Sequence, residues 1–121
     1  MDDMPETRRL MRRVLERDGL DVTEASTGEQ ALKRIVAERP DLVVLDLRLP
    51  GISGFDVARA VRANADRQIA RTVLLACSAS VQVEVEMEAL DAGCDAFEGK
   101  PFDIATFPAL VRTLVARHAG T

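Results

Sequence analysis

Short runs of branched aliphatic residues alternate along this 121-residue chain with longer segments of helical periodicity. Residues 42–45 and 72–76 are almost continuously apolar, which is typical of strands that helices cover on both faces. Such strands belong to parallel sheets, because each parallel connection needs a crossover that lies over one face. The alternation therefore predicts an α/β fold built on a doubly wound parallel sheet with short connections.

The first two helices have clear start and stop signals. Pro5 favours the first turn of a helix and Gly19 favours its end, so we expect a helix between them. Thr27 can cap a second helix, with Gln30 three residues later, and Pro40 closes that helix. The apolar residues of both segments recur at helical spacing, which predicts that each helix buries one face.

The remaining segments follow the same pattern. Between Val81 and Leu90 the apolar residues alternate as in a strand but also recur at helical spacing, and we expect a helix that ends near Gly93. Gly51 and Gly54 mark a loop, after which Phe55, Ala58 and Val61 are spaced for a third helix. The other expected elements are short strands over residues 20–25 and 96–99 and a closing helix over residues 104–117. A chain of about this length ordinarily forms one domain.

Charge and composition exclude several classes of function. The formal net charge is −4, and the aromatic residues are four Phe with no Trp or Tyr, so we expect no nucleic-acid binding. No apolar run approaches the ~20 residues that span a bilayer, and no secretion segment is evident, so we expect a cytoplasmic protein without membrane association. Cys77 and Cys94 fit neither a zinc-site nor a disulfide spacing, and we expect reduced, buried thiols.

Five polar residues lie at the expected ends of strands or in the adjoining loops: Asp2, Asp3, Asp46, Ser78 and Lys100. In doubly wound sheets, ligands bind at the carboxyl ends of the strands. Carboxylates crowded at one place would repel each other unless a hard cation joins them, and oxygen ligands of this kind suit Mg²⁺. The cluster therefore predicts a magnesium site.

These residues also have the chemistry that phosphoryl transfer needs. One carboxylate can attack phosphorus while the cation and the ammonium group of Lys100 neutralise the phosphoryl oxygens. The hydroxyl of Ser78 can donate a hydrogen bond to a further phosphoryl oxygen. We therefore expect a phosphoryl-accepting carboxylate at this edge of the sheet.

Five motifs in chain order carry a resemblance to a known family: Asp2-Asp3, residues 42–51 (LVVLDLRLPG) followed by Gly54, Ser78-Ala79, Ala92-Gly93, and Lys100-Pro101-Phe102. Each motif is common alone, but the five together at this spacing are specific. The chain resembles the CheY-like receiver domain of bacterial two-component response regulators over essentially its whole length. The resemblance implies a flavodoxin-like receiver fold with the strand order 2-1-3-4-5.

The resemblance also implies a role for each acidic residue. It implies that Asp46 accepts a phosphoryl group from a histidine kinase or a histidine phosphotransfer protein, as in a phosphorelay. Asp3 would bind Mg²⁺ directly, with Asp2 assisting. The carboxylate of Asp46 and the main-chain carbonyl of Arg48 would be further ligands of the metal. The protein would thus be a phosphoprotein that depends on Mg²⁺.

The same resemblance implies a conformational switch. Ser78 and Lys100 would contact the phosphoryl group after its transfer. Phe97 falls where the family has an aromatic side chain that turns inward when the hydroxyl residue moves toward the phosphate. Ser78 and Phe97 are therefore the expected switch pair.

The chain departs from the family at its first strand. Only Met1 precedes the acidic pair, where receivers have a strand of about five residues that lies between the second and third strands. One explanation is that Met1 is a mis-assigned start and the chain begins further upstream. The other is that the strand is absent, so the sheet rearranges or takes a strand from another copy in a swapped dimer.

We interpret residues 1–121 as a stand-alone receiver domain without an output domain, a phosphoacceptor switch and not an enzyme acting on external substrates. Its downstream protein target would bind the surface formed by residues 81–90, 96–98 and 104–117. The alternative is a pseudo-receiver that binds partners without phosphorylation, because the displaced amino terminus carries the acidic pair away. A small phosphohydrolase is a weaker alternative, since the chain is short for a substrate-specificity cap.

Overall fold

The computed structural model describes residues 5–17, 19, 22–48, 52–78, 82–99 and 105–119, with side chains described between residues 9 and 116. Its elements in chain order are α1 (Pro5–Arg17), α2 (Gly28–Glu38), β1 (Leu42–Asp46), α3 (Gly54–Arg62), α4 (Arg67–Ala70), β2 (Val73–Ser78), α5 (Val83–Asp91), β3 (Ala96–Gly99) and α6 (Phe107–Ala119). From α2 onward helices and strands alternate as the sequence predicts, apart from the short additional helix α4, whereas α1 and α2 follow each other without a described strand between them. The α/β class is confirmed.

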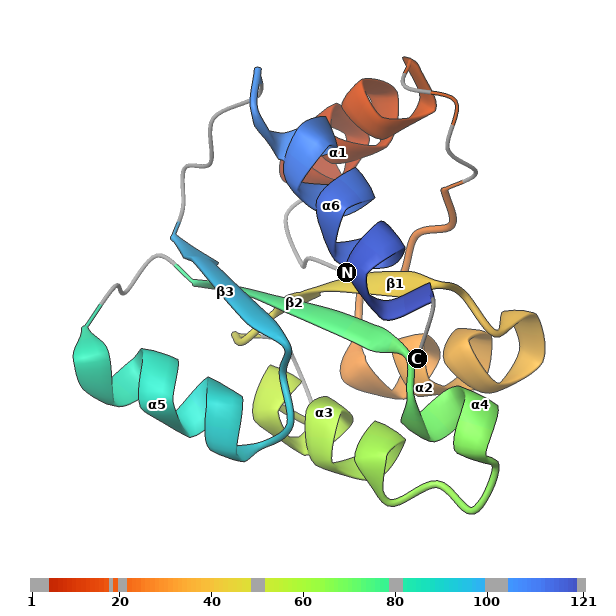
Figure 1. Cartoon of the computed structure of the whole chain (residues 1–121), viewed down its shortest axis with the longest axis vertical. Helices are drawn as coiled ribbons and strands as arrows, with labels where there is room; N and C mark the ends of the chain where they lie inside the picture. The colour runs from red at the N-terminus through yellow and green to blue at the C-terminus, as the bar shows by residue number, and fades with distance from the viewer. Residues whose placement is uncertain are drawn as a thin grey trace.

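The described strands form one parallel sheet in the order β1-β2-β3 (Figure 1). Strand β1 pairs with β2 so that Asp46 lies opposite Cys77, and β2 pairs with β3 so that Ser78 lies opposite Gly99. Strand β2 is therefore central and is buried at every position, which explains why its sequence is apolar throughout. In this part of the chain, β1 is an edge strand.

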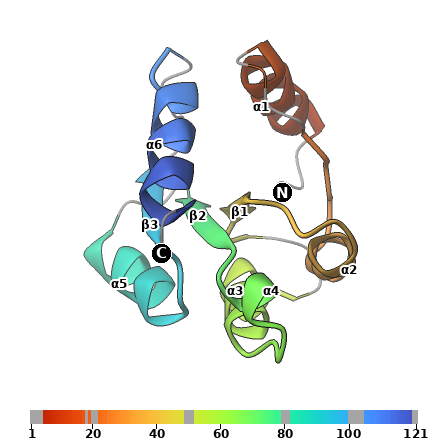
Figure 2. The same ribbon diagram turned by 45° about the vertical axis from the view of Figure 1, so that its right-hand side comes forward.

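Helices cover both faces of the sheet (Figure 2). On one face, Met11 and Leu15 of α1 and Val111 of α6 pack with Leu75 and Cys77 of β2. On the other face, α2, α3, α4 and α5 pack against Leu45, Leu74 and Ala76 and their neighbours in a second cluster. The doubly wound arrangement is thus confirmed, with two apolar layers that meet at the sheet.

Capping residues set the helix ends where the sequence places them. Thr27 caps α2, because its hydroxyl accepts a hydrogen bond of 3.1 Å from the backbone N–H of Gln30. Ser53 and Asp56 form a capping box at the start of α3. Gly19 follows α1 with a φ of +84°, a conformation that favours glycine.

Residues 22–25 differ from the sequence prediction. A strand was expected over residues 20–25, but residues 22–25 are not in a strand, and residues 20–21 lie outside the described part of the chain. A strand needs a neighbour that accepts and donates backbone hydrogen bonds, and the described sheet ends at β1 without reaching this segment. The prediction was therefore wrong for residues 22–25.

Helix α5 resolves the ambiguous segment in favour of a helix that ends just before Gly93. Only Ala89 of its residues is buried. Val83, Met87 and Leu90 are 64%, 61% and 47% exposed, so the helical stripe predicted from their spacing faces outward. Helix α5 thus presents an apolar stripe on its exposed side.

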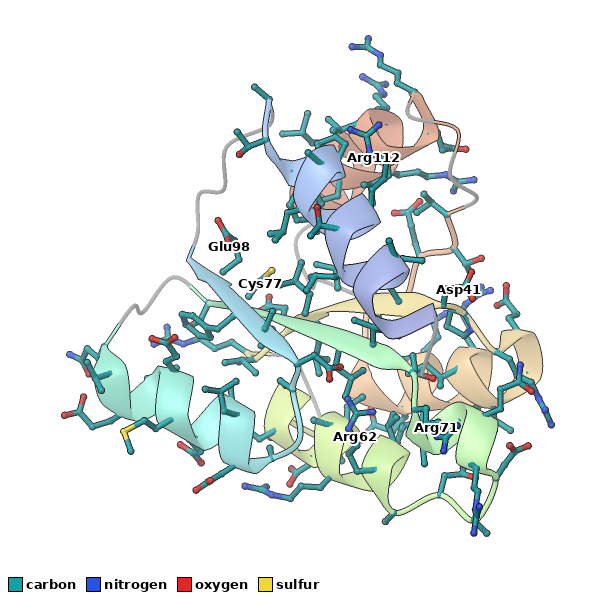
Figure 3. The ribbon with its side chains drawn as sticks, in the orientation of Figure 1. Asp41, Arg62, Arg71, Cys77, Glu98 and Arg112 are labelled. Carbon is teal, nitrogen blue, oxygen red and sulfur yellow. The ribbon has the colours of Figure 1, made fainter. Side chains whose placement is uncertain are left out.

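Arg62 of α3 links the amino-terminal ends of β2 and β3 through hydrogen bonds. Its guanidinium donates to the carbonyls of Ala70, Thr72 and Gly93 and to the carboxylate of Asp95, at 2.7 to 2.8 Å. The same carboxylate accepts from the N–H of Leu74 at 2.8 Å. These bonds satisfy several partly buried polar groups through the side chain of Arg62, which is labelled in Figure 3.

Both cysteines are free and buried, as expected. Burial raises the pKa of the Cys94 thiol to about 11, so the protonated form prevails at neutral pH. In the described residues, none of the helices has the length and apolar character needed to cross a bilayer.

Candidate functional site

Asp46 and Ser78 end adjacent strands on the same edge of the sheet. Asp46 is the last residue of β1 and is 5% exposed, and Ser78 is the last residue of β2 and is 2% exposed. Because Asp46 pairs with Cys77, Ser78 stands one residue further along. They are two of only three buried polar or charged residues in the described chain. Such burial is unusual for a carboxylate and marks this edge as a candidate site.

Backbone hydrogen bonds shape the turn after Asp46. The N–H of Arg48 donates to Oδ1 of Asp46 at 3.0 Å. The N–H of Leu47 donates to the carbonyl of Cys77 at 3.1 Å, which extends the β1–β2 ladder one residue past Asp46. The side chain of Asp46 is therefore oriented by the backbone of its own turn, as in an Asx turn.

Gly54 brings the start of α3 against this turn. Its N–H donates to the carbonyl of Leu47 at 3.3 Å. A Cβ at this position would lie 2.5 Å from the carbonyl oxygen of Asp46 and 2.7 Å from Cα of Leu47. Only glycine allows so close an approach of two backbones. The sequence analysis places Gly54 in the motif that follows residues 42–51, but its contact with the backbone of Asp46 and Leu47 appears only in three dimensions.

The loop before α3 has a second attachment, to α2. The N–H of Ile52 donates to Oε1 of Glu29 at 3.2 Å. A Cβ on Gly28 would collide with the side chain of Ile52, so this approach also requires glycine. Glu29 and Gly28 were not predicted as site residues, and no local sequence signal distinguishes their contact with a loop more than twenty positions away.

Ser78 and Phe97 lie on the same face of the sheet. Phe97 is in register with Ala76, and side chains two residues apart on a strand share a face, so Ser78 and Phe97 point to the same side. Phe97 is half-buried and packs against the core cluster that includes Ala76 and Val57. The structure thus brings the predicted switch pair to adjacent strands on one face.

Three predicted site residues, Asp2, Asp3 and Lys100, lie outside the described residues. Lys100 directly follows β3, whose last residue Gly99 pairs with Ser78. The described residues contain no group of three or more His, Cys, Asp or Glu side chains that could hold a metal ion. At the strand edge they supply one buried carboxylate, that of Asp46, which is an oxygen donor of the kind that Mg²⁺ prefers.

Comparison with known proteins identifies the family of this fold. The family model for the response regulator receiver domain matches residues 1–112. The chain belongs to the response regulator receiver domain family. Receiver domains are signalling domains of two-component systems, and phosphorylation and magnesium binding are general properties of the family.

Two curated relatives illustrate the similarity. The KDP operon transcriptional regulatory protein KdpE of Escherichia coli (strain K12) is 35% identical over 121 residues, which is 100% of this chain and 52% of KdpE. The DNA-binding response regulator MtrA of Mycolicibacterium smegmatis is 36% identical over 118 residues, which is 98% of this chain and 50% of MtrA. The receiver chain thus spans about half the length of the curated relatives it matches.

Solved structures of receivers share the fold. The Francisella response regulator 1452 receiver domain has a TM-score of 0.86 at 28% identity, over 96% of this chain and 93% of that one. The chemotaxis response regulator CheY4 of Vibrio cholerae has a TM-score of 0.85 at 26% identity, over 93% of this chain and 92% of that one. The prediction of a flavodoxin-like receiver fold is therefore confirmed.

Proposed function

We propose that this receiver is a magnesium-dependent phosphoacceptor switch in which Asp46 takes a phosphoryl group from a histidine kinase or a histidine phosphotransfer protein. The observation that carries the proposal is the position of Asp46: a nearly buried carboxylate at the carboxyl end of β1, beside the end of β2. In parallel α/β sheets this edge is where ligands bind. Membership of the receiver family supports the same assignment.

The transfer itself requires a positioned carboxylate. An oxygen of Asp46 attacks the phosphorus of the phosphohistidine, so that an O–P bond forms as the P–N bond breaks and the imidazole nitrogen leaves with a proton from solvent. The N–H of Arg48, at 3.0 Å from Oδ1, helps to orient the attacking group. The low exposure of Asp46 also limits the access of water to the acyl phosphate.

Mg²⁺ would be held by the carboxylates of Asp46, Asp2 and Asp3 and by the main-chain carbonyl of Arg48. When bound, the ion would neutralise charge on the phosphoryl oxygens. Lys100 would add a second positive charge to the same group. Of these groups, the turn at residues 46–48 is the part that the structure describes, and its single buried carboxylate fits a hard cation.

The response to phosphorylation would pass through Ser78 and Phe97. The hydroxyl of Ser78 would move toward the phosphoryl group, and Phe97 would follow inward on the same face of the sheet. Phe97 belongs to β3, which contacts α5. A movement of Phe97 would therefore change the surface formed by α5 and β3.

This surface is the one we assign to a downstream protein partner. Val83, Met87 and Leu90 form an exposed apolar stripe on α5, and acidic residues such as Glu84 and Glu88 flank it. Exposed apolar stripes on helices are typical of interaction sites. The predicted partner surface over residues 81–90, 96–98 and 104–117 includes this stripe.

The decisive experiment is incubation of the protein with acetyl phosphate and Mg²⁺, followed by intact mass measurement. We expect a gain of one phosphoryl group that disappears in Asp46→Asn and when EDTA removes the metal. Asp41→Asn is the matched control, because Asp41 is an exposed aspartate directly before the opposite end of the same strand and its substitution should leave labelling unchanged. Ser78→Ala should slow labelling by about 10- to 100-fold.

The pseudo-receiver alternative predicts a different result. No mass gain in the wild type, under conditions that label a known receiver, would contradict the phosphoacceptor proposal and favour partner binding without phosphorylation. Labelling of Asp46→Asn at the wild-type level would instead show that a residue other than Asp46 carries the phosphoryl group.

A further inference from the structure

Three of the five large hydrophobic side chains that are exposed in the described chain lie on α5. They are Val83, Met87 and Leu90, and their spacing of four and three residues puts them on one side of the helix. We call these three residues the α5 stripe. The other two, Leu10 and Val36, lie singly on α1 and α2. Exposed apolar side chains of the described chain therefore gather on α5, as they do where a partner covers a surface.

Carboxylates line both flanks of the α5 stripe. A helix advances by roughly 100° per residue, so Glu84, Glu88 and Asp91 fall on one flank and Glu86 falls on the other. All four of these side chains are exposed. The sequence of α5 contains no Lys, Arg or His. The exposed side of α5 is therefore an apolar centre with an acidic border on each side.

These four carboxylates form no ion pair within the described part of the chain. Six acidic side chains elsewhere pair with arginines at 2.7 to 3.3 Å: Glu16, Glu24, Glu38, Asp56, Asp66 and Asp95. On α5, Glu84 and Glu88 are one helical turn apart, and like charges at this spacing destabilise a helix. Asp91 adds a negative charge at the carboxyl end, where the helix dipole is already negative. A cationic partner would relieve both effects.

The same charges exclude several occupants of the α5 stripe. Nucleic acids and anionic lipid surfaces would be repelled by the acidic borders. A second copy that used its own α5 would bring two acidic surfaces together, which disfavours a symmetric contact between the two helices. The basic helix α1 of a second copy could not offer its apolar side, because Met11 and Leu15 are buried against the sheet. The complementary occupant is a helix with apolar residues on one side and Lys or Arg along its edges.

We propose that the α5 stripe binds a basic amphipathic helix of a different protein. Apolar residues of that helix, spaced by three and four positions, would pack on the α5 stripe. Its lysines or arginines would pair with the carboxylates on both flanks, which sets its orientation and favours it over acidic competitors. This contact rests on the proposed function in one respect, since phosphorylation of Asp46 would alter it through Phe97.

The test measures the binding of a synthetic peptide to the full chain by isothermal titration calorimetry. The peptide is acetyl-Lys-Leu-Ala-Lys-Lys-Leu-Ala-Lys-Leu-Ala-Lys-Lys-Leu-Ala-amide, in which the leucines share one side of a helix. We expect saturable binding that weakens about 10-fold when NaCl is raised from about 50 to about 500 mM, because salt screens exposed charges. Two control peptides replace every Lys with Glu or every Leu with Gln, and each should bind at least about 10-fold more weakly.

A first set of variants tests the acidic border. Glu84→Gln combined with Glu88→Gln removes two charges from one flank and should weaken binding about 10-fold. The combination of Glu84→Lys with Glu88→Lys should shift the preference toward the acidic control peptide. Glu16→Gln combined with Asp41→Asn is the matched control, because it removes two exposed carboxylates that lie away from α5 (Figures 1 and 3) and should leave binding unchanged.

A second pair of variants tests the apolar centre. Met87→Ser removes the middle side chain of the α5 stripe and should weaken binding about 10-fold. Val36→Ser is its control, because Val36 is a half-exposed apolar residue on α2 and should leave binding unchanged. All of these positions are exposed, and circular dichroism checks that each variant is folded.

The proposal is overturned if the basic peptide binds no more tightly than the acidic one, or if the Gln variant and Met87→Ser bind it as the wild type does. Sedimentation velocity tests the second copy: a dimer that Met87→Ser dissolves and that excludes the peptide would make another copy of this chain the occupant.

Intact mass measurement after treatment of the same samples with acetyl phosphate separates this proposal from the phosphoacceptor role. Peptide binding without labelling would contradict only the phosphoacceptor role. Labelling without peptide binding, in both the labelled and the unlabelled protein, would contradict only the basic partner helix.

Discussion

The two sides of β1 are built very differently. On the packed side, which faces β2, all five residues of β1 pair with the neighbouring strand, and Leu45 is completely buried. On the cavity side, which faces residues 22–25, a cavity of about 550 Å³ takes the place of tight packing. Among the described residues, β1 therefore has a close-packed neighbour on one side and an open volume on the other.

This difference shows which side of β1 holds the candidate phosphoacceptor Asp46 in position. The Leu47–Cys77 hydrogen bond and the close approach of Gly54 hold the turn after Asp46 from the packed side. Arg62 fastens the opposite ends of β2 and β3 on that same side. We therefore expect changes on the packed side to affect both stability and phosphorylation, and changes on the cavity side to be tolerated better.

The largest effect should come from Arg62→Ala. It removes four hydrogen bonds and leaves the carbonyls of Thr72 and Gly93 without their cationic partner, which should cost about 3–5 kcal/mol of unfolding free energy. Urea unfolding measures this. Arg59→Ala is the control, because Arg59 makes an exposed ion pair with Asp56 and should cost under about 0.5 kcal/mol. Equal losses in both variants would contradict the importance assigned to Arg62.

Gly54→Ala should have the next largest effect. The added Cβ would press on the backbone of Asp46 and Leu47, so we expect a loss of about 2–3 kcal/mol and slower labelling by acetyl phosphate. In the control Gly19→Ala, the Cβ meets nothing within 4 Å, and only the positive φ should cost about 1–2 kcal/mol. Normal labelling of Gly54→Ala would show that the turn does not need this contact.

A matched pair of core substitutions compares the two sides of β1 directly. Ala76→Leu adds volume on the packed side, where Ala76 is fully buried, and should cost about 1–3 kcal/mol. Ala25→Leu adds the same volume at the cavity and should cost under about 1 kcal/mol or stabilise the fold. Thermal and urea unfolding of the two variants give the comparison. If Ala25→Leu is the more damaging, the cavity is not available space.

The smallest expected effect concerns pH. Burial raises the pKa of Cys94 from 9.0 to about 11, so the folded state retains a proton that the unfolded chain has lost above pH 9. The contribution of the Cys94 thiol to the free energy of unfolding is therefore fully present below pH 9. As pH rises toward about 11, this contribution is lost, which lowers the free energy of unfolding by about 1 kcal/mol. Urea midpoints at pH 8 and 10.5 should differ less in Cys94→Ala than in the wild type. An unchanged difference would remove Cys94 as the cause.

Much of the fold could be predicted from local patterns. Residues 42–45 and 73–77 are apolar because both faces of their strands are covered, and this property is visible in the sequence. Residues 22–25 could not be predicted in the same way, since a strand forms only where a neighbour is present to pair with it. The sequence also did not reveal that the apolar stripe of α5 is exposed, because helical spacing alone does not distinguish a buried face from a binding face.

The sequence could predict those parts of the candidate site that follow from the order and direction of the strands alone. The rule that parallel strands end at one edge brings Asp46 and Ser78 together, and register then places Phe97 on the same face as Ser78. The contributions of Gly54 and Arg62 depend on distances between elements far apart in sequence, so they emerged only from the structure. The roles of Asp2, Asp3 and Lys100 stay predictions.

The fastening at Asp95 limits how β3 can move. The carboxylate of Asp95 accepts a hydrogen bond of 2.8 Å from the N–H of Leu74, and the backbone N–H of Asp95 donates one of 2.8 Å to the carbonyl of Leu74. The same carboxylate also accepts from the guanidinium of Arg62. Sliding β3 along β2 would break all of these bonds at once. A displacement of β3 that begins near Phe97 must therefore be a rotation of the strand about Asp95 at its amino-terminal end. In such a rotation the carboxyl end of β3 moves further than the residues next to Asp95.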